Sequence, residues 1–448
     1  MSSIDRAFHQ SIQKNPAAAR GLTDQYTEEL LATDCCFGDE AIPSFIKPFF
    51  LPAGHYQMLH DVVPTLMNMI EKVIQAYFRY PELHSFFGLP QGADDYMKID
   101  PGFDRTVVIA RPDAFWHRGR FQFLEFNCDS PAGSGYADIQ QKILCRHFTL
   151  KHLSHGYKWK RPHRLQSLLR ALLACYRQFA GAGRSPQVAI VDWGHMRTQK
   201  EFLITSQYFQ SQGIDTVIAD PRDLKLRKGK LYHRSFRVDL VYRRVIFNEL
   251  WEKKKEVRDF MSAYRHHKVC MVNPFQSRLA SQKSILAVLT DPEFDFLFSA
   301  KERAVRDRYI PWTRRVKHIE MKFQANRASM RKYVRRQRKN WVLKPSDRYG
   351  GKGVIIGPEA KPHKWMTQME LAFRDPHNWV VQNFVPVPMT EVPLPKKGRL
   401  IWAQKKMNIN PFIFNGRLAG AMARLSNESV INVSAGGGLV PAIIYEKK

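Results

Sequence analysis

The sequence predicts an α+β protein made of several packed units, and three patterns lead to that fold class. Long stretches such as residues 56–87 carry apolar side chains at helical spacing. Residues 187–220 read as a buried strand, a helix and a second buried strand, the pattern of a parallel βαβ unit. The C-terminal part alternates short apolar strands with turns such as Asn415-Gly416. A chain of 448 residues is long enough for two or three such units.

The composition indicates a globular protein with a basic surface. Apolar residues make up 44% of the chain, yet none of their runs is long enough to span a membrane. The N-terminus lacks a signal-peptide pattern, and the six cysteines form no C-x-x-C pair. We therefore expect a cytoplasmic protein with no membrane partner. By charge alone, the net value of +29 favours ATP, an acidic substrate, nucleic acid or a charged membrane surface as a partner, and a solvated basic surface is the alternative.

The N-terminal part is expected to be helical, with two strands that carry polar groups. Pro64 should kink or restart the helix over 56–87, and residues 163–180 form a second amphipathic helix. Residues 106–113 and 121–127 read as strands joined by a turn at Gly119-Arg120.

Polar residues of these two strands predict a metal site. Strand alternation would place Phe121, Phe123, Glu125 and Asn127 on one side. Together with Asp113, the carboxylate and amide oxygens of Glu125 and Asn127 are the hard ligands that Mg²⁺ prefers, usually alongside substrate phosphates. The alternative is a polar sheet edge followed by a turn over 129–133.

The middle of the chain predicts a βαβ domain and a basic segment. The domain follows a linker over 181–186, and the lack of a G-x-G-x-x-G motif argues against a dinucleotide site. Residues 301–339 are rich in lysine and arginine, and a helix there would bring Arg327, Arg331, Arg335 and Arg338 near one face. The segment reads either as a solvated basic helix or as a surface for nucleic acid or another polyanion.

Residues 341–357 read as strand, glycine-rich loop and strand. Lys344 ends the first strand, and the loop contains Ser346 and three glycines, which let backbone N–H groups approach a polyanion. A nucleotide triphosphate is the polyanion that we expect, although an ordinary glycine-rich hairpin is the alternative. The loop is no Walker motif, because no G-x-x-x-x-G-K-[ST] pattern is present.

Several short motifs, in this order, resemble a known superfamily. The chain looks like an ATP-grasp ligase of the circularly permuted type, in the branch of glutathionylspermidine synthetases and related carboxylate–amine ligases. No counterpart of an amidase domain is found, and the residues after Asp129 differ from a glutathione-site pattern, which leaves the substrate open. The motifs are Arg111-x-Asp113 with Glu125-x-Asn127-x-Asp129-x-Pro131, Gln282-Lys283-Ser284, Lys344-Pro345, Gly350-Gly351-Lys352-Gly353, Val380-Val381-Gln382 and Gly420-Ala421-Met422-Ala423-Arg424.

The resemblance implies a permuted ATP-grasp fold with a Rossmann-like βαβ pre-ATP-grasp domain. Residues 110–127 should then pack against residues 400–435, although they are far apart in the sequence. We predict three units: residues 1–184, with the metal-bearing strands; 185–268, the βαβ domain; and 269–448, with the nucleotide lysines and the lid loop.

The same resemblance implies an ATP- and Mg²⁺-dependent ligase. It would join a small-molecule or peptide carboxylate to an amine through an acyl phosphate. A polyanion-binding protein that uses residues 301–339 and a catalytically silent ATP-binding module are the alternatives. The expected roles are catalysis for Arg111 and Arg424; metal binding for Asp113, Glu125 and Asn127; and nucleotide binding for Lys283, Lys344, Ser346, Gly350, Gly351, Lys352, Gly353, Gln382 and Glu391.

Overall fold

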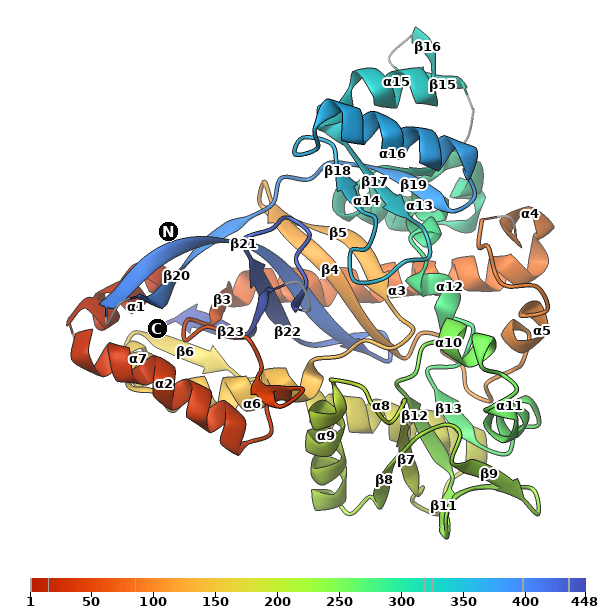
Figure 1. The fold of residues 1–448 in the computed structure, drawn as a ribbon, viewed down its shortest axis with the longest axis horizontal. Helices are drawn as coiled ribbons and strands as arrows, with labels where there is room; N and C mark the ends of the chain where they lie inside the picture. The colour runs from red at the N-terminus through yellow and green to blue at the C-terminus, as the bar shows by residue number, and fades with distance from the viewer. Residues whose placement is uncertain are drawn as a thin grey trace.

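A computed structural model describes residues 2–14, 16–84, 86–316, 320–323, 326–396, 399–433 and 436–448. The chain forms a large mixed sheet, a parallel sheet and a smaller antiparallel sheet, each with its own helices (Figure 1). The predicted α+β class is confirmed. Among the described residues, no helix is both long and apolar enough to cross a membrane.

The large sheet has the strand order β3-β23-β22-β21-β4-β5, with β20 paired to β21 and β6 to β23. Its strands are β3 (Phe49–Pro52), β4 (Ile109–His117), β5 (Arg120–Asn127), β6 (Tyr157–Lys160), β20 (Met389–Lys396), β21 (Arg399–Phe414), β22 (Arg417–Ser426) and β23 (Gly438–Lys447). Strand β4 pairs with β21, so that Ala114 lies opposite Ile409 and Ala110 opposite Ile413. The predicted packing of the early strands against the late ones is therefore confirmed.

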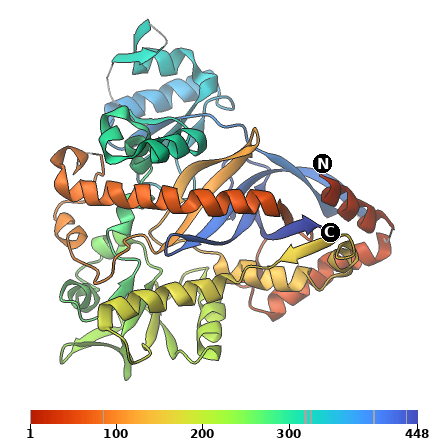
Figure 2. The same cartoon turned by 180° about the vertical axis from the view of Figure 1, so that it is seen from behind.

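Helices cover both faces of this sheet because its apolar residues alternate. Ile413 and Ile444 join the core beneath α3 (Ala53–Arg79), whereas Phe412 and Ile443 join the core beneath α6 (Ser134–Leu144) and α8 (Arg164–Ala180). Figure 2 shows α3 crossing one face. The sequence predicts that Pro64 kinks or restarts this helix. The helix runs through Pro64 without restarting. The other N-terminal elements are α1 (Ser3–Lys14), α2 (Pro16–Ala32), β1 (Cys36–Phe37), β2 (Glu40–Ala41), α4 (Pro81–His84), α5 (Asp94–Met97) and α7 (Phe148–Leu153).

A β-bulge at Leu124 corrects the predicted facing of β5. Asp113 pairs with Glu125, but the next residue of β4, Ala114, pairs with Phe123, so Leu124 has no partner in the register. Phe123 therefore packs in the core beneath α3, stacked on Phe126, while Glu125 turns to the opposite side. The prediction that Phe121 and Phe123 share a face with Glu125 and Asn127 is wrong, because the extra residue breaks the alternation.

The middle of the chain forms a parallel sheet with the order β13-β12-β7-β8. The predicted βαβ unit is confirmed, since β7 and β8 pair in parallel and α9 connects them. The sheet also includes β13, just beyond the predicted limit at residue 268; the domain limits and the Rossmann-like assignment stay predictions. The elements are β7 (Val188–Val191), α9 (Gln199–Ser211), β8 (Thr216–Ala219), β9 (Leu224–Arg227), β10 (Lys230–His233), β11 (Phe236–Val238), β12 (Leu240–Arg243), α10 (Phe247–Glu252), α11 (Arg258–Arg265) and β13 (Cys270–Val272).

The smaller sheet has the order β14-β19-β17-β18 and packs against α16 around Trp341 and Trp365. The predicted strand, loop and strand are present as β17, the loop over 346–354 and β18. The elements are α12 (Ser277–Ser281), α13 (Ser284–Thr290), η1 (Pro292–Leu297), α14 (Ala300–Tyr309), β14 (Thr313–Arg315), β15 (Glu320–Phe323), β16 (Asn326–Ser329), α15 (Met330–Arg336), η2 (Arg338–Asn340), β17 (Trp341–Pro345), β18 (Ile355–Ile356), α16 (Pro362–Arg374) and β19 (Trp379–Asn383).

The predicted basic helical face within residues 301–339 is wrong. Arg327 belongs to strand β16, whereas Arg335 belongs to the short helix α15. The side chains of Arg327 and Arg331 lie outside the described residues. Arg338 follows in a 3-10 turn, and its guanidinium group donates hydrogen bonds to the carbonyl oxygens of Gly357 and Ala360. The described backbone of the segment is broken into strands and short helices, so it does not form the single helix that the prediction required.

Candidate active site

A cavity of about 330 Å³ lies between the large sheet and the smaller antiparallel sheet. Strands β4, β5, β21 and β22 line one side, and β17, β18 and β19 line the other. Ten predicted site residues contribute to its lining. They are Arg111, Asp113, Glu125, Asn127, Lys283, Lys344, Gly350, Gly351, Gln382 and Arg424.

Lys344 reaches into this pocket from β17 and is 7% exposed. Its ammonium group donates hydrogen bonds to the Gln382 side-chain oxygen at 2.6 Å and to the Leu124 carbonyl at 3.1 Å. The bulge in β5 thus supplies one of the acceptors. Burial lowers the pKa of Lys344 to about 8, and the charge of Glu125 opposes this shift. The site therefore holds a buried cation that an anionic ligand would stabilise.

Lys283 stands just before α13 and pairs with Glu125, the two charged groups being 3.4 Å apart. Its ammonium group also donates to the carbonyl oxygen of Arg348 at 2.6 Å. Burial opposes ionisation of Glu125, but Lys283, Lys344 and Arg424 outweigh it and lower the pKa of the Glu125 carboxyl to about 2. Glu125 is consequently ionised at neutral pH.

Asp113 and Arg424 form the centre of a buried polar network on the large sheet. The Arg424 guanidinium pairs with Asp113 and donates to the side-chain oxygens of Asn408 and Asn410. Asp113 also accepts hydrogen bonds from the amides of Asn127, Asn408 and Asn410. Both oxygens of the Asp113 carboxylate are therefore engaged. The network brings together residues that are more than 300 positions apart in the chain.

Arg111 lies beside this network on β4 and donates a hydrogen bond to the Ala132 carbonyl at 2.5 Å. Its Nε atom is buried without a hydrogen-bond partner. Burial and the nearby Arg424 lower the pKa of Arg111 to about 10, so the group stays positively charged at neutral pH. Such a cation is suited to an anionic ligand in the pocket.

The lid loop, residues 346–354, lines part of the pocket, and its backbone depends on its glycines. Gly350, Gly351 and Gly353 have φ angles of +67°, +73° and +78°, which side-chain-bearing residues rarely adopt. A Cβ atom at Gly351 would lie 2.1 Å from a methyl carbon of Val430. Both the backbone angle and the close approach therefore require glycine at Gly351.

Four predicted nucleotide-binding residues do not line the cavity: Ser346, Lys352, Gly353 and Glu391. Ser346 is buried and joins the lid loop to α13 through a 2.5 Å contact between its hydroxyl group and that of Ser284. Lys352 is exposed, with its ammonium group 5.7 Å from the centre of the Tyr349 ring. The carboxylate of Glu391 accepts a hydrogen bond from Gln404 on the surface.

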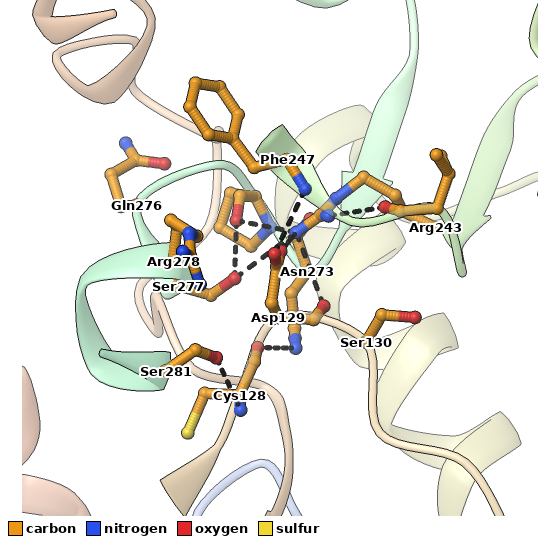
Figure 3. Close-up of polar contacts among 12 residues, drawn as sticks. Cys128, Asp129, Ser130, Arg243, Phe247, Asn273, Gln276, Ser277, Arg278 and Ser281 are labelled. Carbon is orange, nitrogen blue, oxygen red and sulfur yellow. Dashed lines mark hydrogen bonds and ion pairs between the residues drawn. The ribbon is translucent and has the colours of Figure 1, made fainter. Parts of the chain in front are cut away.

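The pocket also includes Asn408, Arg278 and Asp347, which received no role in the sequence analysis, and Asp129, which the motifs contained without a role. Asn408 and Asn410 alternate on β21, a spacing that could have indicated a shared face. Arg278 on α12 pairs with Asp347 of the lid loop, and no sequence signal marks this contact. Asp129 enters the wall from the loop after β5, where Arg243 pairs with it at 2.6 Å and the Phe247 N–H donates to it at 3.0 Å (Figure 3).

The donor atoms in the pocket fit a magnesium ion that is shared with phosphates. Among the described residues there is no cluster of three His, Cys, Asp or Glu side chains that could hold a metal alone. Asn127 uses its amide nitrogen to donate to Arg111 and Asp113, so its side-chain oxygen is left for another partner. Glu125 supplies an ionised carboxylate beside it. Mg²⁺ is commonly held by one or two such groups together with substrate phosphates and water.

A family model for circularly permuted ATP-grasp type 2 proteins matches residues 94–426. The chain belongs to the circularly permuted ATP-grasp type 2 family. The match covers the early strands, the parallel sheet, both lysines and Arg424, so the predicted family is confirmed. A glutathione synthetase-like effector from Globodera pallida, solved without ligand, has the same fold. The two share 12% identity and superpose with a TM-score of 0.66 over 95% of this chain and 97% of that one.

Several curated relatives are longer than this permuted ATP-grasp chain. An uncharacterized protein of Mycobacterium bovis is 24% identical over 353 residues, which cover 72% of this chain and 57% of the relative. A Frankia casuarinae protein provisionally named a glutamate–cysteine ligase is 22% identical over 336 residues, 71% of this chain and 36% of its own length. The chain thus spans little more than half of the mycobacterial relative.

Proposed function

We propose that the chain is an ATP- and Mg²⁺-dependent ligase that joins a carboxylate to an amine. A single observation carries the proposal: Lys283, Lys344, Arg111 and Arg424 meet the ionised Glu125 in one cavity between two sheets. Family membership supports the use of ATP, and the relative that is provisionally named a glutamate–cysteine ligase supports amide-bond formation.

In the first proposed step, a substrate carboxylate attacks the γ-phosphate of ATP, which gives an acyl phosphate and ADP. Lys283 and Lys344 would offset the negative charge of the phosphates during transfer. Lys344 is suited to this role because burial leaves its charge poorly solvated before a phosphate arrives. The apolar side chains of Val342 and Ile356, which line the same cavity, would cover the base.

In the second proposed step, the amine attacks the acyl carbon and inorganic phosphate leaves. Arg111 and Arg424 would stabilise the oxygen that becomes negative in the tetrahedral intermediate. A preorganised donor of this kind contributes roughly 3–4 kcal/mol to transition-state stabilisation. The lid loop would exclude water, which would otherwise hydrolyse the acyl phosphate.

We propose that Glu125 and Asn127 hold Mg²⁺, and that Asp113 is a further candidate ligand. Mg²⁺ bound there would neutralise phosphate charge beyond what the lysines provide. Asp113 could join the ion only if its network with Arg424, Asn408 and Asn410 opened. We therefore assign Asp113 first to the orientation of Arg424.

The alternatives have less support. A silent nucleotide-binding module would have no need for Arg111, Arg424 and Glu125 beside the two lysines. A polyanion-binding surface over residues 301–339 lacks the continuous helix on which that hypothesis relied, because α14, β14 and α15 divide the segment.

Hydroxylamine trapping tests the proposal without knowledge of the amine. The protein is incubated with ATP, Mg²⁺, hydroxylamine and pools of carboxylic acids, and hydroxamates and nucleotides are measured. We expect an ATP-dependent hydroxamate from one pool, with ADP formed in equal amount and no AMP. AMP with pyrophosphate would indicate an acyl adenylate and contradict the mechanism. No hydroxamate from any pool would count against the ligase.

A further inference from the structure

Arg278 is distinctive among the residues of the pocket because it forms an ion pair with Asp347 of the lid loop. Arg278 is 7% exposed and lies on α12 (Figure 3). Its guanidinium group pairs with the carboxylate of Asp347, and its Nε atom donates to the side-chain oxygen of Asn248 at 3.2 Å. Asn248 in turn donates to the second oxygen of Asp347 at 2.9 Å. A carboxylate from the lid loop is thus held by an arginine and an amide.

The charges of the pocket disfavour the binding of a polycation. Six cationic residues line the cavity against four acidic ones. Each acid already has a cationic partner: Asp113 has Arg424, Glu125 has Lys283, Asp129 has Arg243 and Asp347 has Arg278. An ammonium group of a polyamine would therefore find no unpaired carboxylate among the residues that line this cavity.

Resting on the proposed ligase activity, we infer that Arg278 binds the non-reacting carboxylate of an amine co-substrate, which is an amino acid or a peptide and not a polyamine. Asp347 occupies this position when the co-substrate is absent. An arginine fork accepts either carboxylate with similar hydrogen-bond geometry, so the substrate replaces the lid residue without leaving a buried cation unpaired. Ser281 lines the same cavity; its hydroxyl oxygen accepts a hydrogen bond from the Cys128 N–H, which leaves the O–H to donate to the polar backbone of such a ligand.

The test measures ADP release with the carboxylate that hydroxylamine trapping identifies and with three sets of amines. The sets are amino acids and dipeptides, the same compounds as carboxamides, and the polyamines putrescine, spermidine and spermine. We expect activity with the free acids, and a KM about 10- to 100-fold higher for the matching amides, since a charge-assisted hydrogen bond is lost. Activity with polyamines alone would overturn the inference and leave the ligase intact. No ADP release with any amine set would overturn both.

Variants separate binding from a purely structural role. Arg278→Met should raise the KM of the free acid by the factor that separates the amide from the free acid in the wild type. The KM of the amide should not rise further in this variant, and the KM for ATP should stay unchanged. Arg278→Lys keeps the positive charge, so its KM for the free acid should lie between that of the wild type and that of Arg278→Met. Asp347→Asn should leave the KM of the free acid unchanged or lower it, because the competing carboxylate is gone. If Asp347→Asn is as harmful as Arg278→Met, the ion pair is a closing latch and the inference is wrong.

The control is Arg258→Met, which removes an arginine whose side chain is 86% exposed on α11, outside the pocket. It should change neither the KM for the amine nor the ratio between acid and amide. A similar rise in KM in this control would mean that the general loss of positive charge, and not the Arg278 site, causes the effect.

Discussion

Replacing Lys344 with methionine should change the way in which stability depends on pH. The ammonium group is buried, and its pKa in the folded protein is about 8, compared with an ordinary value of 10.5. Between these two values the unfolded chain still holds a proton that the folded protein has lost. The free energy of unfolding of the wild type must therefore rise as the pH rises through this range.

The size of the effect follows from the two pKa values. Integration of the proton difference gives a gain of about 2 kcal/mol in the unfolding free energy of the wild type between about pH 7 and pH 9.5. Lys344→Met lacks this contribution at every pH. The variant also loses the hydrogen bonds to Gln382 and to the Leu124 carbonyl. This loss lowers its unfolding free energy by a similar amount at every pH, so it does not change how that free energy depends on pH.

Urea unfolding followed by circular dichroism across this pH range measures the effect. The difference in unfolding free energy, variant minus wild type, should fall by about 2 kcal/mol from the lower to the higher pH. Lys230→Met, which removes an exposed lysine on β10, is the control and should follow the wild type. Parallel curves for the wild type and Lys344→Met would refute the reasoning, because Lys344 would then titrate as it does in the unfolded chain.

Three further predictions concern the same pocket. Without Mg²⁺, the dissociation constant for ADP should rise about tenfold from about pH 7 to pH 9 as Lys344 loses its proton, and calorimetry with Lys344→Met should show no such rise. Asp113→Leu leaves the guanidinium of Arg424 without its carboxylate and should lower the unfolding free energy by about 3–5 kcal/mol. Adding Arg424→Met should restore part of this loss. A double variant that is still less stable would contradict this account of the pair. Gly351→Ala should weaken ADP binding about tenfold through the contact with Val430. The control is Gly213→Ala, at a φ of +78° with open space around it, which should not weaken ADP binding. Equal affinities for the two variants would argue against the role of the lid.

Much of the site follows from local sequence patterns. The glycines of the lid loop predict a strand, loop and strand, because positive φ angles at Gly350 and Gly351 are accessible chiefly to glycine. The order of the motifs around Lys283, Lys344 and Arg424 led to the family, although the contacts between them span hundreds of residues. The pairing of β4 with β21 was predicted only because the permuted fold requires it; local propensity contains no information about it.

Other features depend on tertiary structure and left no readable signal. The bulge at Leu124 arises from the register between β4 and β5, so strand alternation alone placed Phe123 on the wrong side. The arginine content and spacing of the basic segment suggested one basic helical face. The segment instead divides into strands and short helices, which composition alone does not reveal. The pairing of Arg278 with Asp347 depends on how the lid loop folds over α12, which a sequence pattern cannot encode.

The central claim is that one pocket binds ATP and activates a carboxylate, and substrate-dependent ADP release tests it most directly. Purified protein is supplied with ATP, Mg²⁺ and combined pools of carboxylates and amines, and the wild type is compared with Lys344→Met and Glu125→Gln. The account predicts ADP release that depends on a pool and that both substitutions reduce at least about 100-fold, as expected for the loss of preorganised charge. ADP release that persists in both variants, or that never depends on a pool, would contradict it.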